Sequence, residues 1–260
     1  MTDFLPSAEE VDRQIESEFR QDIEDSLAEF DVLLCNLRSE EVAKESGLGS
    51  LQLLAHNLLA QGRGVNIPAI ELLGHRLGEY VSGIGDLNRA NMDDIQTFID
   101  KIHSVLEGNE DGVNDTPSLV RALPPKPVAD VDFGDITQKN IEVLLIVPEK
   151  SMARIVEKEL AECGYRISNA RSSFEGFKMV LQTRPDMIIA SMELTEMTGI
   201  DLSCAFAAMP QTHSMPFALL TSYDWGNPAL DRLPPRAALI RKGKKFAEDM
   251  AEAFARFRIT

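Results

Sequence analysis

Hydrophobic residues recur every three or four positions through residues 1–109, a spacing typical of amphipathic helices. These helical patterns cover residues 8–38, 51–65, 68–81 and 93–106. The spacing leaves open whether the first pattern is one helix or two. The glycine-containing stretch 39–50 reads as a loop, while Asn66 and Pro68 are typical of a helix start. We therefore expect an all-α, up-down four-helix bundle over residues 1–109.

From Ile141 onward, short apolar runs alternate with helical patterns. We expect strands at 143–147, 164–168, 187–190, 217–220 and 237–240, and helices at 152–163, 172–182, 199–209 and 246–257. This alternation predicts an α/β domain over residues 140–260 with a parallel, flavodoxin-like, doubly wound sheet. Residues 110–139 are acidic, rich in proline and without a period, so we expect a linker between two domains.

Charge divides the chain in the same way. The net charge of −16 falls entirely on residues 1–140, which hold 27 acidic and 11 basic side chains, whereas residues 141–260 hold 15 of each. An acidic first half argues against nucleic acid as a partner, because phosphates would be repelled. The asymmetry favours two domains of different kind.

The remaining composition is that of an ordinary globular protein, with 44% hydrophobic and 26% charged residues. No apolar run is long enough to cross a bilayer, and the first residues carry no secretory signal pattern. Cys35, Cys163 and Cys204 are odd in number and scattered, so neither disulfides nor a metal cluster are expected. We expect a cytoplasmic protein that binds no membrane, metal or cofactor, and the sequence does not indicate its oligomeric state.

One histidine stands out in the helix that begins near residue 51. His56 lies off the core-facing stripe and is followed by small residues at Ala60, Gly62 and Gly64, which leave room for another protein to approach the imidazole. The alternative is an ordinary surface histidine. The stretch LAHNLLAQGRG resembles the signature of histidine phosphotransfer (HPt) domains, in which a helix carries A-H-x-x-K-G-(Q/S)-(G/A).

The resemblance implies that His56 carries phosphate. Its neighbours in the motif are Leu59, Ala60, Gln61, Gly62 and Arg63. Gln61 and Gly62 match the HPt pattern, whereas Leu59 replaces the usual lysine and Ala60 the usual glycine. A lysine would offset phosphate charge. Arg63 lies two turns further along the helix, about 10 Å of helix rise, so it would have to fold back to do so.

Residues 140–260 resemble a response-regulator receiver domain over essentially their whole length. The stretches RPDMIIAS, MTG, MPFALLTS and IRKG stand in the family's order and spacing. The resemblance implies a phosphate-accepting aspartate at the position of Ser191 and a magnesium-binding acidic pair at Pro148 and Glu149. Thr221 and Lys242 match the family's hydroxyl and lysine positions.

The receiver chemistry is therefore expected to be missing. A serine hydroxyl without an adjacent base is a weak nucleophile. With Pro148 and Ser191 in place, two of the three carboxylates that would hold magnesium are gone. We interpret this half as a pseudo-receiver. Phosphorylation of Ser191 by a serine kinase and partner docking through Trp225, the only tryptophan, are weaker alternatives.

Two functions remain open. The first is a phosphorelay protein that carries phosphate on His56 and uses its receiver-like domain for protein interaction. The second is an adaptor that works without phosphorylation, in which both domains are degenerate binding modules. Either would have histidine kinases or receiver proteins as partners, and neither is an enzyme, since no P-loop, dinucleotide or nucleophile-elbow motif is present.

Overall fold

The computed structural model describes residues 8–64, 67–108, 115–128, 131 and 136–259. The chain divides into two compact units, Met1–Pro127 and Val128–Thr260. We call them the helical unit and the sheet unit.

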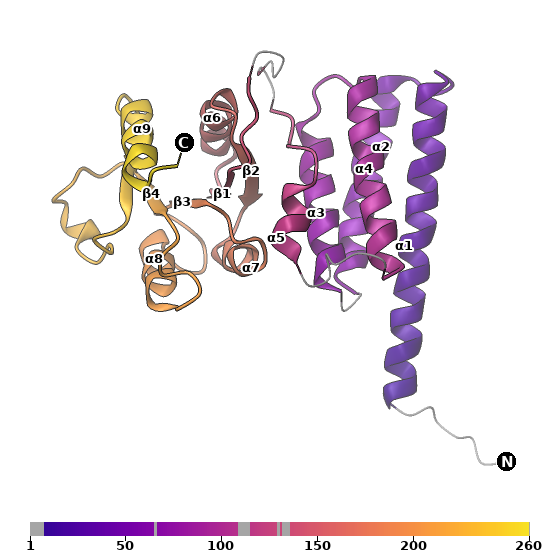
Figure 1. The fold of residues 1–260 in the computed structure, drawn as a ribbon, viewed down its shortest axis with the longest axis horizontal. Coiled ribbons are helices and arrows are strands. Elements are labelled where there is room, and N and C mark those ends of the chain that lie inside the picture. Colours follow the sequence, from indigo (N-terminus) through magenta and orange to yellow (C-terminus); the bar gives the residue numbers. More distant parts are fainter. Residues whose placement is uncertain (1–7, 65–66, 109–114, 129–130, 132–135, 260) are drawn as a thin grey trace. The chain divides into compact units, whose positions relative to one another are not determined.

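The helical unit contains five helices in its described part (Figure 1). They are α1 (Ala8–Arg38), α2 (Lys44–Gly62), α3 (Pro68–Gly83), α4 (Arg89–Leu106) and α5 (Thr116–Arg121). α1 packs against α2 and α4, and α3 packs against the same two helices. The pattern 8–38, left open by the sequence, is one continuous helix. The predicted cap Asn66 lies outside the described residues.

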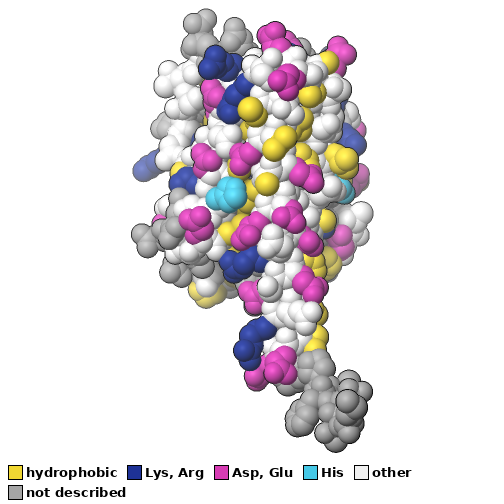
Figure 2. Space-filling model, turned by 90° about the vertical axis from the view of Figure 1, so that its right-hand side faces the viewer, with side chains coloured by type: hydrophobic (Ala, Val, Ile, Leu, Met, Phe, Trp, Pro, Cys, Tyr) yellow, Lys and Arg dark blue, Asp and Glu magenta, His cyan; other side chains and the backbone are white. Residues whose placement is uncertain are grey.

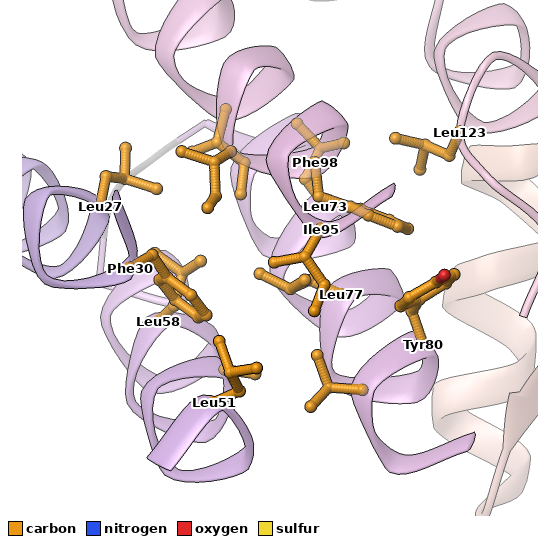
Figure 3. Packing of buried hydrophobic residues seen from close by; sticks show 14 of the residues in the cluster. Leu27, Phe30, Leu51, Leu58, Leu73, Leu77, Tyr80, Ile95, Phe98 and Leu123 are labelled. Atoms are coloured by element: carbon orange, nitrogen blue, oxygen red, sulfur yellow. The ribbon is translucent and has the colours of Figure 1, made fainter. Parts of the chain in front are cut away.

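One hydrophobic core joins these helices, because the apolar stripe of each faces the others (Figure 3). Its fully buried members include Phe30, Leu58, Leu73 and Phe98, one from each of the four long helices. Burying a side chain of this size stabilises the fold by roughly 1.5–3 kcal/mol. The stripes predicted for 68–81 and 93–106 are therefore the buried faces of α3 and α4.

Two sequence predictions in this unit are wrong. The stretch 39–50 is not all loop, because α2 already begins at Lys44. Gly47 lies within α2 where a β-carbon would overlap the Leu37 side chain, so close packing of α1 on α2 explains this glycine. The stretch 110–139 is not all linker, because α5 lies in it and Leu119 and Leu123 are buried in the helical core (Figure 3).

The sheet unit is a five-stranded parallel sheet with the strand order β2-β1-β3-β4-β5. The strands are β1 (Glu142–Ile146), β2 (Arg166–Ala170), β3 (Met187–Ser191), β4 (Phe217–Thr221) and β5 (Ala238–Arg241). This order is that of flavodoxin-like folds, so the predicted fold class of the second half is confirmed. Strand bounds differ from the predicted ones by up to two residues.

Helices cover both faces of the sheet (Figure 1). α6 (Lys150–Glu162) and α9 (Phe246–Phe257) pack on one face, and α7 (Ser173–Thr183) and α8 (Gly199–Ala208) pack on the other. Between β4 and β5 the chain forms only the short 3-10 helix η2 (Pro228–Leu230). All strands run in one direction, so their carboxyl ends meet at one edge, where flavodoxin-like folds bind ligands.

Candidate functional site

His56 lies on the outer face of α2. The inner face of this helix is formed by Leu51, Ala55, Leu58 and Gly62, all of them buried. Because α-helical positions turn by about 100° each, His56 falls opposite this stripe, and its side chain is exposed. It forms no hydrogen bond or ion pair with the residues that the structure describes. The imidazole nitrogens are therefore open to a partner.

The surface around His56 carries no formal charge along α2. Between Glu45 and Arg63 the helix has no acidic, lysine or arginine side chain. Leu53, one turn before His56, is 61% exposed, and Ala60, one turn after it, is exposed as well. In a unit with a strong acidic excess, this face is uncharged, and its small residue Ala60 leaves room for another protein surface to approach closely.

The other HPt-like positions serve helix packing. Gln61 accepts a hydrogen bond from the Ser26 hydroxyl of α1 at 2.9 Å. Gly62 packs against α3, where a β-carbon would lie 3.3 Å from the backbone of Glu71. Leu59 is half-buried beside Gly74 of α3. These contacts fix α2 between α1 and α3 and so hold His56 outward.

Arg63 lies at the end of α2 and contacts an acidic residue of α3. Its Nε lies 3.7 Å from a carboxylate oxygen of Glu71, and the two side chains are 61% and 25% exposed. From the sequence, Arg63 was expected to offset the charge of a phosphate on His56 only if its side chain folded back along the helix. In the structure this cation points to Glu71, so such use would require leaving the ion pair.

The receiver-like positions come together at the carboxyl edge of the sheet. Ser191 and Thr221 are the last residues of β3 and β4, and both are buried. Lys242 directly follows β5 and donates its backbone N–H to the carbonyl oxygen of Thr221 at 2.8 Å. Thr221 Oγ lies 3.3 Å from the sulfur of Met192. The parallel register thus brings three predicted site residues to one edge.

The two acidic-pair positions follow β1 at the same edge. Pro148 is half-buried and offers no ligand oxygen from its side chain. Glu149 is exposed and accepts a hydrogen bond from the Ser151 hydroxyl at 2.8 Å, at the start of α6. Among the described residues, no three His, Cys, Asp or Glu side chains lie close enough to hold a metal ion.

One charged network at this edge was missed by sequence reasoning. Arg241 pairs with Asp249 of α9 at 2.6 and 2.7 Å and with Asp224 of the loop after β4 at 2.8 Å. The hydrogen bonds from Arg241 hold the pKa of the Asp249 carboxyl below its usual range. The only signal in the sequence is an arginine beside Lys242. Trp225, next to Asp224, is 59% exposed.

No helix in the described part of the chain is long and apolar enough to span a bilayer. A scan of protein-family models gives no match, and a search of curated proteins gives none either.

Solved structures similar to this chain include receiver domains, and the similarity covers the C-terminal half. The chemotaxis response regulator CheY4 of Vibrio cholerae is 20% identical, with a TM-score of 0.41, over 46% of this chain and 99% of that one. The receiver domain of a signal transduction histidine kinase from Syntrophus aciditrophicus is 23% identical, with a TM-score of 0.41, over 45% and 89%. That of a sensor histidine kinase from Pseudomonas aeruginosa, which holds a magnesium ion, is 18% identical, with a TM-score of 0.41, over 45% and 98%.

Proposed function

We propose that this chain is a cytoplasmic two-component signalling protein that carries phosphate on His56. The helical unit would act as an up-down four-helix bundle of the HPt type, and the sheet unit as a receiver-like module that no longer takes phosphate. The observation that carries the proposal is the exposed, unpaired imidazole of His56 on an uncharged face of α2. The protein would be a carrier and not an enzyme.

The proposed step is a transfer between an aspartyl phosphate of a partner receiver and His56. A neutral ring nitrogen attacks the phosphorus, a phosphorus–nitrogen bond forms, and the phosphorus–oxygen bond to the partner aspartate breaks, which releases its carboxylate. The uncharged face formed by Leu53, Asn57 and Ala60 would pack against the partner and exclude water. The same transfer in reverse would pass the phosphate on.

Arg63 would supply the positive charge that the HPt pattern places at residue 59. Its ion pair with Glu71 is a partly exposed one, and such pairs contribute only about 0–1 kcal/mol. A phosphate group with a charge of about −1.5 to −2 is a stronger counter-ion than one carboxylate. The pair with Glu71 is therefore weak enough for Arg63 to turn toward phosphorylated His56.

The sheet unit would serve as a binding module without phosphoryl chemistry. Ser191 is a neutral, buried hydroxyl where an acceptor carboxylate would be needed, and Glu149 is engaged by Ser151. Lys242 and Thr221 alone supply no acceptor. Its partners would be histidine kinases or receiver proteins.

The second candidate function is an adaptor that needs no phosphate on either unit. The ion pair between Arg63 and Glu71 favours it, because the one cation at the end of α2 already has a counter-ion. In this case His56 would be a docking residue. Substitution of His56 would then weaken partner binding, and even the wild type would take up no label.

Phosphotransfer to the full chain distinguishes the two functions. The protein is incubated with a receiver protein carrying radiolabelled aspartyl phosphate, and acid-labile, base-stable label is measured on wild type, His56→Gln and His103→Gln. His103 is a half-buried histidine of α4 and serves as the matched control. The relay predicts label on wild type and His103→Gln but not on His56→Gln. Absence of label from wild type would rule the relay out and leave the adaptor.

A further inference from the structure

The N-terminal part of α1 extends beyond the rest of the helical unit (Figure 1). The two helices that pack against α1, which are α2 and α4, end beside residues 19 and 20 of α1. Phe19 packs at Gly64 beyond the end of α2, and Arg20 donates a hydrogen bond to the carbonyl of Leu106, the last residue of α4, at 2.6 Å. Residues 9–18, which we call the projecting helix, are all exposed. They add about 15 Å of helix.

The projecting helix keeps the apolar stripe of the buried part of α1. Val11 and Ile15 are 39% and 44% exposed, and they precede Phe19 and Ile23 at intervals of four residues. Ile23 is fully buried in the helical core. An isolated helical segment of this length is marginal in water. The stripe continues in register, and no residue that the structure describes covers it, so we take it as a surface for another element.

Charge limits what can cover it. The projecting helix holds five acidic side chains and one basic one, which are Glu9, Glu10, Asp12, Glu16, Glu18 and Arg13. Figure 2 shows acidic and hydrophobic side chains side by side along the projection. Pairing with the same helix of a second molecule would set acids against acids, which is unfavourable. The complementary surface must be basic and apolar.

The described part of the sheet unit carries a surface of this kind. Tyr223 and Trp225 are 41% and 59% exposed in the loop after β4, and Lys242, Lys244 and Lys245 follow β5, the last two exposed. The ion pair of Asp224 with Arg241 at 2.8 Å fixes the two loops side by side. We call these five residues the Trp225 surface. It offers aromatic rings to Val11 and Ile15 and ammonium groups to the acids.

We propose that the projecting helix of one molecule docks on the Trp225 surface of a second copy of this chain. The apolar stripe supplies contact area, and the charges set orientation and strength. The contact joins two different patches, so it is heterologous and builds a head-to-tail assembly. This self-association goes beyond the proposed phosphate transfer, which requires only one molecule and its partner.

Sedimentation velocity of the full chain over a range of concentrations tests the proposal. The average mass is expected to rise with concentration and to fall when salt is added, since salt screens exposed charges. Val11→Gln with Ile15→Gln is expected to lower the association constant at least about tenfold, equivalent to about 1.4 kcal/mol. Val32→Gln is the matched control, because Val32 is a 61% exposed aliphatic residue of the same helix outside the projection. It should leave association unchanged.

A charge reversal identifies the surface that is bound. Lys244→Glu with Lys245→Glu should weaken association, whereas Lys44→Glu, at an exposed lysine of α2, should not. Adding Glu16→Lys and Glu18→Lys to the variant that carries Lys244→Glu and Lys245→Glu should restore association. A chain that stays monomeric at all concentrations overturns the proposal, as does self-association that the Val11 and Ile15 substitutions leave intact. A change in sedimentation coefficient without concentration dependence would show docking within one molecule and would overturn it too.

Discussion

Glu71 restrains the cation that phosphate transfer to His56 would use, and its removal should therefore speed the transfer. Two unit charges about 4 Å apart interact by about 1 kcal/mol in water. The Nε of Arg63 lies 3.7 Å from Glu71, with the side chains 61% and 25% exposed, so the net contribution is about 0.2–1 kcal/mol. Glu71→Gln should raise the initial rate of label transfer by about 1.4- to 5-fold, which is the same free energy expressed as a ratio.

The assay is a double-mutant cycle on that rate. Arg63→Ala should slow the transfer, because no other cation follows His56 within two turns of α2. Glu71→Gln in the Arg63→Ala background should then have no effect, since there is no cation left to release. An equal acceleration in both backgrounds would show that Glu71 acts by repelling phosphate directly. A rate unchanged by Glu71→Gln would refute the role of Arg63 altogether.

Three further predictions follow from other parts of the chain. Leu123→Ala should lower the free energy of unfolding, measured by urea denaturation, by about 2–5 kcal/mol because it opens a cavity in the helical core. An unchanged free energy of unfolding would show that Leu123 belongs to a linker and not to the core. Arg241 lowers the pKa of Asp249, so this carboxylate stabilises the fold above its usual pKa. That contribution should be lost as the pH falls through the lowered pKa. In Asp249→Asn, the urea concentration at the midpoint of unfolding should therefore fall less steeply with decreasing pH than in wild type. Wild type should take no phosphate from acetyl phosphate at Ser191, whereas Ser191→Asp with Pro148→Asp should take up acid-labile label in magnesium.

Periodicity predicted most of the elements, because the side chains that define it are the ones the fold buries. The stripes of α3 and α4 and the five strands of the sheet are examples. It failed where packing overrides local propensity. Gly47 lowers helix propensity yet lies inside α2 because Leu37 occupies the space of its side chain. Thr116–Arg121 is a helix among prolines because its apolar residues complete the core.

The candidate sites show the same division. Ser191, Thr221 and Lys242 meet at one edge of the sheet because the strands that they end or follow are parallel. The alternation of strands and helices in the sequence already indicated parallel strands. The ion pair of Arg63 with Glu71 joins two helices and was not predictable from either. The position of an exposed residue on a helix can be predicted from one segment, whereas its electrostatic partners depend on the neighbouring segment.

The central claim is that His56 carries phosphate, and locating the modification by mass tests it most directly. The full chain is incubated with a phosphorylated receiver protein, kept at alkaline pH to preserve phosphohistidine, and digested for peptide mass spectrometry. The account predicts one phosphate on the α2 peptide that contains His56, with fragment ions that place it on the imidazole. Transfer that leaves this peptide unmodified, or phosphate found only on another residue, would contradict it.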